Sequence, residues 1–306
     1  MDNLNFKVVK ILNDVLETNW ELPFKYGGNA SSMGTGAFID KKGYILTCAH
    51  VVCNSVSINV VIPGEGEKPY SVKLVGFCPA LDIGLLKIVN YKPKHYFEIG
   101  DSNILKLGDE ITTIGFPGTG DNNDNLKITK GIISGQQYGK IQIDAPISPG
   151  NSGGPMIFED KIVGINVSSM VSFHIQNMNF SVPINNFLEI NNDLLKLDKF
   201  KILYRPSLTL DYNTTNKIMR RKSKVDSGIY INNIYPNSMF LGAGLKEGDI
   251  LLKINNYKID NYGFLEKEWF NEKIDLKIYF NNKKNNEKVS IEYWSKSKNK
   301  KIIRNL

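Results

Sequence analysis

Two hydrophobic patterns divide the chain. Residues 4–18 are predicted to form an amphipathic helix, because five apolar residues recur there at helical spacing: Leu4, Val8, Ile11, Leu12 and Val15. Between residues 33 and 187 the pattern changes to short β-branched runs such as YILTCA, SVKLVGF and KIVGINV, separated by Gly, Pro, Asn and Asp. Many short strands with turn residues between them are typical of an all-β protein, and this length suits two small barrels. The predicted fold class is therefore mainly β, with an N-terminal amphipathic helix.

A second β-rich segment follows the first. Residues 188–206 are polar with scattered leucines, and we expect a linker there. Residues 207–295 again contain short apolar runs, and residues 296–306 are expected to be a basic tail. The predicted order is an extension over residues 1–32, a β-barrel domain over residues 33–187, the linker, a second β domain and the tail.

The net charge of +7 does not by itself predict nucleic-acid binding. Much of the positive charge lies late, in IMRRKSK, NNKKNNEK and SKSKNKKIIR, where a solvated lysine-rich surface is the simpler interpretation. No zinc finger, helix-turn-helix or aromatic-interleaved RNA motif accompanies these runs, so we do not expect a nucleic-acid partner. No apolar run approaches the roughly 18 residues of a membrane span, and none is predicted.

The cysteines and the first residues bear on the compartment. An odd count of three, Cys48, Cys53 and Cys78, argues against a disulfide framework, and we interpret them as buried thiols. The Cys48–Cys53 spacing with so few histidines does not make a zinc site, so no metal or other cofactor is expected. The first 20 residues lack the basic start and unbroken apolar stretch of a secretory signal. These features predict an intracellular protein.

The stretch ISPGNSGGPM, residues 147–156, surrounds one serine with three glycines and two prolines. Such a loop suits a serine held at a sharp bend, but a serine nucleophile also needs a base and a group that orients the base. His50 follows the apolar run YILTCA, and Asp82 precedes the run IGLLKI. Taken singly, neither residue requires a catalytic role. His50 could be a packed or exposed histidine, and Asp82 could be a turn former. Their combination with Ser152 is what indicates catalysis.

The segments TCAH, LDIGLLKI and GNSGGP occur in the order His, Asp, Ser, and together they resemble the trypsin-like serine proteases of the HtrA (DegP-like) branch. The resemblance extends to SSMGTGAFIDKKGYILTCAHVV, EIGDSNILKLGDEITTIGFP, ITKGIISG, KIVGINVSS and NFSVPI. It covers most of residues 33–187 and implies a trypsin-like double β-barrel. Val51 stands where many secreted relatives carry a disulfide-forming cysteine, which agrees with an intracellular chain.

The resemblance implies a role for each of these residues. Ser152 would attack a peptide carbonyl, His50 would take its proton, and Asp82 would stay ionised and hold the imidazole. The backbone amides of Gly150 and Ser152 would form the oxyanion hole, and glycine at position 150 would let its N–H turn inward. The implied activity is that of an ATP-independent serine endopeptidase acting on unfolded or peptide substrates.

Substrate preference follows from the residues expected around the P1 side chain. Pro146 lies six residues before the serine, where trypsin-like enzymes place the floor of the P1 pocket. Proline cannot select Lys or Arg as an acid would. Ile147, Ile165 and Val167 would line a shallow apolar pocket, so the resemblance implies a preference for small aliphatic P1 residues.

The segment GIYINNIYPNSMFLGAGLKEGDILLKINN, residues 228–256, resembles a PDZ domain of the HtrA type. PDZ domains bind peptide C-termini by adding a strand to an exposed sheet edge. Ser227, Gly228 and Ile229 are expected to form that edge and its carboxylate loop, although Asp226 beside a bound carboxylate would be unfavourable. The stretch GFLEKEWF is expected to be either the groove helix or part of the core.

Alternatives from other classes stay open at this point. A non-proteolytic scaffold or chaperone would keep the fold and bind partners through the PDZ domain, but it has no need of an intact triad together with Gly150. A basic structural protein bound to nucleic acid rests on charge alone. The resemblance to the HtrA family also implies a trimer that is built through residues ahead of the first barrel strand. The apolar stripe of residues 4–18 is therefore expected either to build a homotrimer or to pack on the chain's own barrel.

Overall fold

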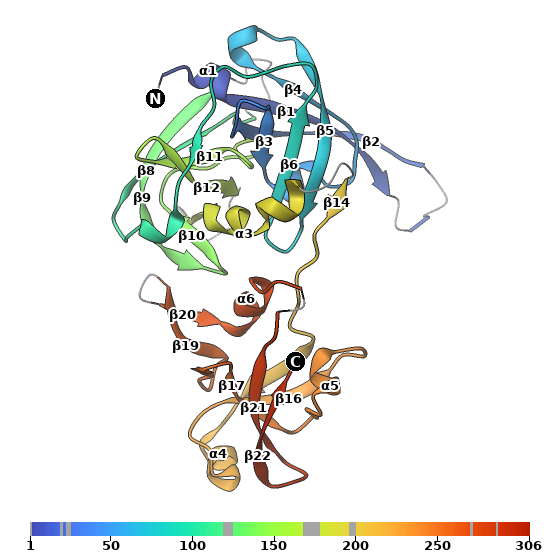
Figure 1. The fold of residues 1–306 in the computed structure, drawn as a ribbon, viewed down its shortest axis with the longest axis vertical. Helices are drawn as coiled ribbons and strands as arrows, with labels where there is room; N and C mark the ends of the chain where they lie inside the picture. The colour runs from blue at the N-terminus through green and yellow to red at the C-terminus, as the bar shows by residue number, and fades with distance from the viewer. Residues whose placement is uncertain are drawn as a thin grey trace. The chain divides into compact units, whose positions relative to one another are not determined.

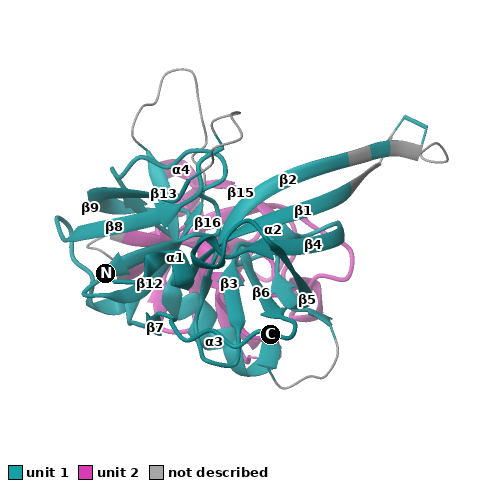
Figure 2. Ribbon diagram, turned by 90° about the horizontal axis from the view of Figure 1, so that it is seen from above, with its two compact units in different colours: residues 1–204 teal, residues 205–306 magenta. Residues whose placement is uncertain are grey.

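The computed structural model describes residues 2–18, 21–22, 26–118, 125–167, 178–195, 200–269, 272–285 and 287–306. Its elements fall into two compact units, residues 1–204 and 205–306, which Figure 2 colours separately. The predicted mainly β fold class is confirmed, because strands make up most of the ordered elements in both units. Among the described residues, no helix combines the length and the apolar character that a membrane crossing requires.

The first barrel closes around six strands in the order β5-β4-β1-β2-β3-β6, with β6 pairing back to β5 (Figure 1). Alternate side chains of these strands point inward, and Phe38, Ile45 and Leu85 are fully buried in the core. The bounds are β1 (Val8–Thr18), β2 (Tyr26–Phe38), β3 (Tyr44–Thr47), β4 (Ser55–Val61), β5 (Pro69–Cys78) and β6 (Ile83–Ile88), with β14 (Lys201–Ile202) pairing in parallel with β5.

The second barrel also closes around six strands, in the order β11-β8-β9-β10-β13-β12, with β12 pairing back to β11. The two predicted barrels are therefore both present, and Ser152 lies in the connection between two strands of the second one. The bounds are β8 (Glu110–Gly115), β9 (Lys127–Gln137), β10 (Lys140–Ile143), β11 (Pro155–Phe158), β12 (Lys161–Val167) and β13 (Asn179–Pro183), with β7 (Glu98–Ile99) pairing in parallel with β12.

The predicted N-terminal helix is wrong for most of its length. Only α1 (Leu4–Lys7) is helical, and β1 begins at Val8 and lies between β2 and β4. Figure 2 shows β1 and β2 running side by side as a long two-stranded ribbon. The buried positions alternate through Val9, Ile11 and Asn13, each at most 2% exposed. A buried asparagine breaks the apolar alternation, and this hid the strand period in the sequence.

A helix also replaces the first part of the linker predicted for residues 188–206. The helix α3 (Ile184–Leu195) buries Phe187, Ile190 and Leu194 in the core of the first unit, so these apolar residues pack rather than connect. The division between the two units falls between Tyr204 and Arg205. The other helical turns of this unit are α1, α2 (Ala49–Val52), η1 (Pro63–Glu65) and η2 (Ser102–Ile104).

The second unit is built on one sheet with the strand order β15-β16-β17-β21-β22, and β18 pairs with β17. A separate hairpin is formed by β19 (Phe264–Trp269) and β20 (Glu272–Asp275). The other bounds are β15 (Leu210–Thr214), α4 (Lys217–Ser223), β16 (Ile229–Ile234), α5 (Met239–Gly242), β17 (Ile250–Ile254), β18 (Tyr257–Lys258), α6 (Leu276–Asn281), β21 (Ser290–Ser295) and β22 (Lys300–Asn305).

Two segments of this unit differ from the prediction. Within the stretch GFLEKEWF, residues 264–269 form strand β19 instead of a groove helix, and Leu265 is fully buried as a core residue. The segment 296–306 is not a free basic tail, because β22 pairs with β21 along its whole length. Ile302 of β22 is 7% exposed, whereas its neighbour Ile303 is 65% exposed. One face of β22 therefore contributes to the core.

Candidate active site

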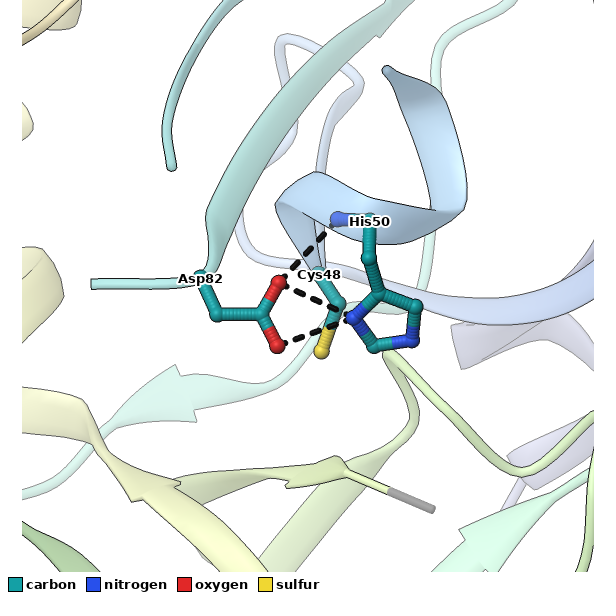
Figure 3. A group of neighbouring side chains, drawn as sticks. All are labelled: Cys48, His50 and Asp82. Atoms are coloured by element: carbon teal, nitrogen blue, oxygen red, sulfur yellow. Dashed lines mark hydrogen bonds and ion pairs between the residues drawn. The ribbon is translucent and has the colours of Figure 1, made fainter. Parts of the chain in front are cut away.

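His50 and Asp82 form a hydrogen-bonded pair at the ends of two neighbouring strands of the first barrel. Strand β3 ends at Thr47, and α2 begins two residues later and carries His50 in its first turn. Asp82 directly precedes β6, the strand that pairs with β3. The Nδ1 atom of His50 lies 2.9 Å from each carboxylate oxygen of Asp82, and the His50 backbone N–H donates to Oδ1 at 3.0 Å (Figure 3).

This pairing determines which imidazole nitrogen can accept a proton. A carboxylate at Nδ1 favours the tautomer that carries its hydrogen there, so Nε2 is the basic nitrogen. Asp82 adopts a positive φ of 54°, and its N–H closes the preceding turn on the carbonyl of Pro79 at 3.2 Å. The Asp82 side chain is 17% exposed and that of His50 is 44% exposed. The orienting carboxylate is thus sheltered while the imidazole reaches solvent.

Ser152 lies in the connection between β10 and β11 and is 6% exposed. The glycines on either side of it, Gly150 and Gly153, adopt φ values of 96° and 85°, in the region that disfavours residues with a Cβ. A Cβ on Gly150 would collide with the carbonyl oxygen of Phe116, and a Cβ on Gly153 with the hydroxyl of Thr47. The backbone path around the serine therefore requires glycine at both positions.

Thr35 of β2 holds this loop against the first barrel. Its backbone N–H donates to the carbonyl oxygen of Ser152 at 2.8 Å, and its hydroxyl donates to the carbonyl oxygen of Gly150 at 2.7 Å. The same hydroxyl accepts a hydrogen bond from the N–H of Phe116 at 3.0 Å. Both carbonyls are thereby turned toward β2, and the orientation of the loop is set by a strand of the other barrel.

Cys48 and Gly153 tie the segments of His50 and Ser152 to one carbonyl group. The Sγ atom of Cys48 donates to the carbonyl oxygen of Asn166 at 3.3 Å, and the N–H of Gly153 donates to the same oxygen at 2.8 Å. Cys48 lies two residues before His50, and Gly153 directly follows Ser152. Burial raises the pKa of the Cys48 thiol well above its ordinary value, so the group stays protonated and keeps donating.

Cys48, His50 and Asp82 also place three potential metal ligands within 4.8 Å of one another. The donor set does not suit a metal ion, because a metal-bound cysteine is a thiolate. Burial and the nearby Asp82 carboxylate both raise the pKa of Cys48 and so disfavour the thiolate. The Asp82 oxygens and His50 Nδ1 already face each other (Figure 3). The arrangement fits proton transfer better than metal binding.

The four residues predicted to shape the P1 pocket do not share one environment. Pro146 is exposed, and Ile147 is 7% exposed. Val167, at the end of β12, is partly buried against the core of the unit. Ile165 is 1% exposed and belongs to that core. Pro146 and Val167 thus keep accessible surface, Ile147 keeps little, and Ile165 supports the region from inside.

The residues predicted to bind peptide in the second unit are not at a sheet edge, so this prediction is wrong. Ser227 and Gly228 lead into β16, and Ile229 pairs with Thr214 of β15 and with Leu251 of β17. A strand with neighbours on both sides has no backbone groups left for a further strand. On this side of the sheet the edge strand is β15, which has β16 as its one neighbour among the described strands.

Three polar residues that hold the site were not singled out from the sequence. They are Thr35, Asn166 and Asn13, whose Nδ2 donates to the carbonyl oxygen of Val51 at 2.8 Å, next to His50. Each is at most 2% exposed. Because buried polar groups need partners, a polar residue at a core position of a predicted strand is the signal that could have identified them.

Comparisons with known proteins agree with this geometry. Residues 34–165 match the family model of the trypsin-like peptidase domain, and residues 211–278 match that of the PDZ domain. The chain is 30% identical over 271 residues to the periplasmic serine endoprotease DegP of Escherichia coli strain K12, covering 80% of this chain and 55% of that protein. It is 32% identical over 281 residues to a probable periplasmic DegP-like serine endoprotease of Marinomonas, covering 87% and 58%. The chain spans little more than half the length of these relatives.

Solved structures share the fold of this chain. The HtrA-type protease AlgW with a decapeptide gives a TM-score of 0.71 at 22% identity, covering 98% of this chain and 94% of that chain. A serine endoprotease from Yersinia pestis gives 0.65 at 21% identity, covering 98% and 92%. At these identities the likeness supports the fold alone.

The predicted intracellular location is contradicted by the curated relatives, whose names place DegP and its homologues in the periplasm. The prediction relied on the pattern of the first residues. In the structure Val8, Val9 and Ile11 of that segment are core residues of the barrel. Their pattern reflects packing and carries no information on export.

Proposed function

Because the chain belongs to the HtrA family of trypsin-like serine proteases, we propose that it is a serine endopeptidase that hydrolyses unfolded or peptide substrates. The observation that carries this proposal is the His50–Asp82 pair, which Cys48 anchors to the carbonyl group that also holds the loop of Ser152. A scaffold or chaperone needs no such arrangement of a basic imidazole beside a constrained serine loop.

In the proposed mechanism Ser152 is the nucleophile and His50 is the general base. The Ser152 Oγ attacks the scissile carbonyl carbon while Nε2 of His50 takes its proton, and the imidazolium then protonates the leaving amine. A water molecule then attacks the acyl carbon, His50 takes a proton from it, and the imidazolium gives that proton to the Ser152 Oγ as the acyl–oxygen bond breaks. Asp82 stays ionised and stabilises the imidazolium through Nδ1. These steps need no nucleotide, which supports ATP-independent turnover.

We assign the oxyanion hole to the backbone amides of Gly150 and Ser152. The Gly150 N–H shares its peptide group with the Pro149 carbonyl, which accepts the N–H of Gly118 at 2.9 Å, and the Ser152 N–H shares its peptide group with the Asn151 carbonyl, which accepts the N–H of Gly154 at 3.0 Å. With these two carbonyls held, the amides keep one orientation and need no rearrangement when negative charge develops. Removal of one such donor typically lowers the rate by about 100- to 1,000-fold.

The substitution Ser152→Ala tests the activity. Cleavage of β-casein in buffer with EDTA and without nucleotide is expected to fall on the order of 10⁴- to 10⁶-fold. Ser148→Ala is the matched control, since Ser148 is an exposed serine of the same loop whose backbone carbonyl, and not its hydroxyl, bonds Asn151. Equal thermal unfolding of both variants would show that the fold is kept. A folded wild-type protein that leaves casein intact would favour the scaffold or chaperone.

For substrate preference we propose cleavage after small aliphatic residues. Pro146 offers no charge to a Lys or Arg side chain, and the nearby acid Asp144 uses its carboxylate to accept the N–H of Ile132 at 2.7 Å. Ile147 and Val167 add apolar surface. Mass spectrometry of β-casein fragments checks this, and a majority of cuts after Lys or Arg would refute it.

We propose that the second unit binds peptides along β15. As the edge strand, β15 can pair with an added extended segment. A hollow of about 430 Å³ lies beside it, with Leu208, Leu210 and Tyr212 in its wall. This apolar wall suits the side chains of a peptide strand, and the solved relative AlgW holds a decapeptide. Titration of the chain with labelled decapeptides tests the groove.

A homotrimer is also part of the proposal, but the proposed surface keeps only Leu4 of the predicted stripe. Val8 and Ile11 are buried in the chain's own barrel and cannot contact another copy. Leu4 and Phe6 of α1 instead line a hollow of about 460 Å³ with Ile128, which is 49% exposed. We propose this surface as the trimer contact. Light scattering should report a trimer for the full chain and a smaller mass for Ile128→Asp, whereas equal masses would place the contact elsewhere.

A further inference from the structure

We propose that the groove along β15 selects peptides that carry a lysine or arginine side chain at the position facing Asp211. This inference rests on the proposed peptide binding at β15. It concerns the charge of the ligand, which the apolar wall of the hollow does not determine. The residues that carry it are the acids on the two sides of the hollow.

Asp211, the second residue of β15, presents an oriented negative charge to the hollow. The hydroxyl of Tyr235 donates to its Oδ2 at 2.9 Å and to its Oδ1 at 3.2 Å, and Nδ2 of Asn233 donates to Oδ2 at 3.3 Å. Both donors are neutral, so they fix the carboxylate without neutralising it. The hydrogen bond to Asp211 raises the pKa of Tyr235, so the hydroxyl stays protonated and keeps donating. Among the described residues, Asp211 has no ion-pair partner.

A second acid lines the hollow from the start of α6. Asp275 caps this helix, and its Oδ1 accepts the N–H of Lys277 at 2.7 Å. Lys277 lines the same hollow and brings one positive charge, so the two acids leave the lining with an excess of negative charge. A peptide strand added to β15 would place its side chains within reach of this charge.

The acidic lining contrasts with the charge of the whole unit. Residues 205–306 contain 20 Lys and Arg residues against 11 Asp and Glu residues. The long-range field of the unit therefore attracts acidic peptides. Direct contact with Asp211 favours basic ones. The two effects have opposite signs, so a comparison of peptides that differ in charge separates them.

Two series of peptides locate the contact. Successive side chains of an extended strand point to opposite faces, so only alternate ligand positions can face Asp211. The probes are fluorescein-labelled decapeptides of Gly and Ser whose last five residues are apolar except at the two varied positions, with a free carboxylate at the end. One series carries Lys, norleucine or Glu at the second and fourth positions from the end. The other series carries the same residues at the third and fifth positions.

Binding is measured by fluorescence anisotropy with the full chain carrying Ser152→Ala, so that the probes are not cleaved. In one series the Lys peptide is expected to bind about two- to five-fold tighter than the norleucine peptide at low salt, as for a solvent-accessible ion pair. The Glu peptide should bind most weakly in that series. The preference should disappear at 0.5 M NaCl, because salt screens exposed charges.

Asp211→Asn should remove the preference for Lys without loss of binding to the norleucine peptide, since the asparagine keeps the size of the side chain. Asp226→Asn is the matched control, because Asp226 is an exposed acid of the same unit outside the lining of the hollow, and it should leave the preference unchanged. Equal binding of Lys and norleucine peptides in both series, or tightest binding of Glu peptides, would overturn the selection while leaving the groove. Absence of binding by every probe would overturn the peptide groove itself.

Discussion

The hydroxyl of Thr35 donates a 2.7 Å hydrogen bond to the carbonyl oxygen of Gly150, across 115 residues of sequence. A strand of the first barrel thereby positions the loop that carries the serine of the second. Because the N–H of Thr35 also donates to the Ser152 carbonyl, the loop is held on both sides of Asn151. The reactive geometry thus depends on a residue that contacts no substrate in the proposed mechanism.

Thr35→Val is expected to lower kcat by up to about 100-fold, the effect of a small displacement of a reacting group. The valine keeps the shape of threonine, but the Gly150 carbonyl and the Phe116 N–H lose their partner. The free energy of unfolding should fall by about 1–3 kcal/mol, the cost of leaving such buried groups unsatisfied. Casein cleavage and urea unfolding measure the two effects. Thr35→Ser, which keeps the hydroxyl, should restore activity, and full activity of the valine variant would contradict the positioning role.

Asp82→Asn should reduce the rate of peptide-bond cleavage by on the order of 10⁴-fold, because the amide no longer holds the imidazole in the tautomer that leaves Nε2 basic. The variant should fold normally, since asparagine fills the same space. Asp144→Asn serves as control, because the side-chain oxygen of asparagine can still accept the Ile132 N–H. Initial rates on a fluorogenic peptide decide this, and comparable rates for the two variants would exclude Asp82 from the triad.

Substitutions in β1 distinguish the strand from the predicted helix. Ile11→Ala should lower the free energy of unfolding by about 2–5 kcal/mol, because Ile11 is fully buried and its removal leaves a cavity. Leu12→Ala should change it by less than about 0.5 kcal/mol, because Leu12 is 38% exposed on the opposite face. Chemical unfolding of the two variants measures the difference. Similar losses for both would argue against this register of β1.

The thiols should differ in reactivity. Burial raises the pKa of the Cys48 thiol, so little of it is thiolate below that raised value. A change from pH 7 to pH 9 should therefore not make Cys48 reactive. Cys53, which is partly exposed, should react with a disulfide reagent such as DTNB in the folded protein. Cys48 should react only after unfolding. Peptide mapping identifies the labelled residue, and rapid labelling of Cys48 in the native state would contradict its burial.

The region from 33 to 187 was predictable because its signals are local. Turn residues mark the ends of the short strands. His50, Asp82 and Ser152 each lie in a segment whose residue types match the local backbone conformation. The φ of 96° at Gly150 is one example, since the sequence has glycine where the backbone demands it. The pairing of His50 with Asp82 needs the tertiary structure, but the order of the three segments was sufficient to suggest it.

The errors arose where the answer depends on strand pairing. The sequence around Ile229 fits an edge strand and a central strand equally well, because it does not determine which strands pair with β16. The lysines of β22 suggested a solvated tail, but exposed charges are also a common feature of edge strands. In β1, the side chain of Asn13 donates a hydrogen bond to the Val51 carbonyl inside the barrel. The residues next to Asn13 in the sequence do not indicate this distant partner.

The central position of β1 gives this strand an unusual part in folding. It pairs with β2 directly after it, but also with β4, where Lys10 lies opposite Val61. During synthesis β1 is made before both of its partners, and its second side is paired only after β4 has been made. A chain that started at Ser31 would lack it and would expose the facing backbone groups of both β2 and β4, a template for aggregation. Removal of residues 1–30 would therefore leave the first barrel unclosed and prone to aggregation.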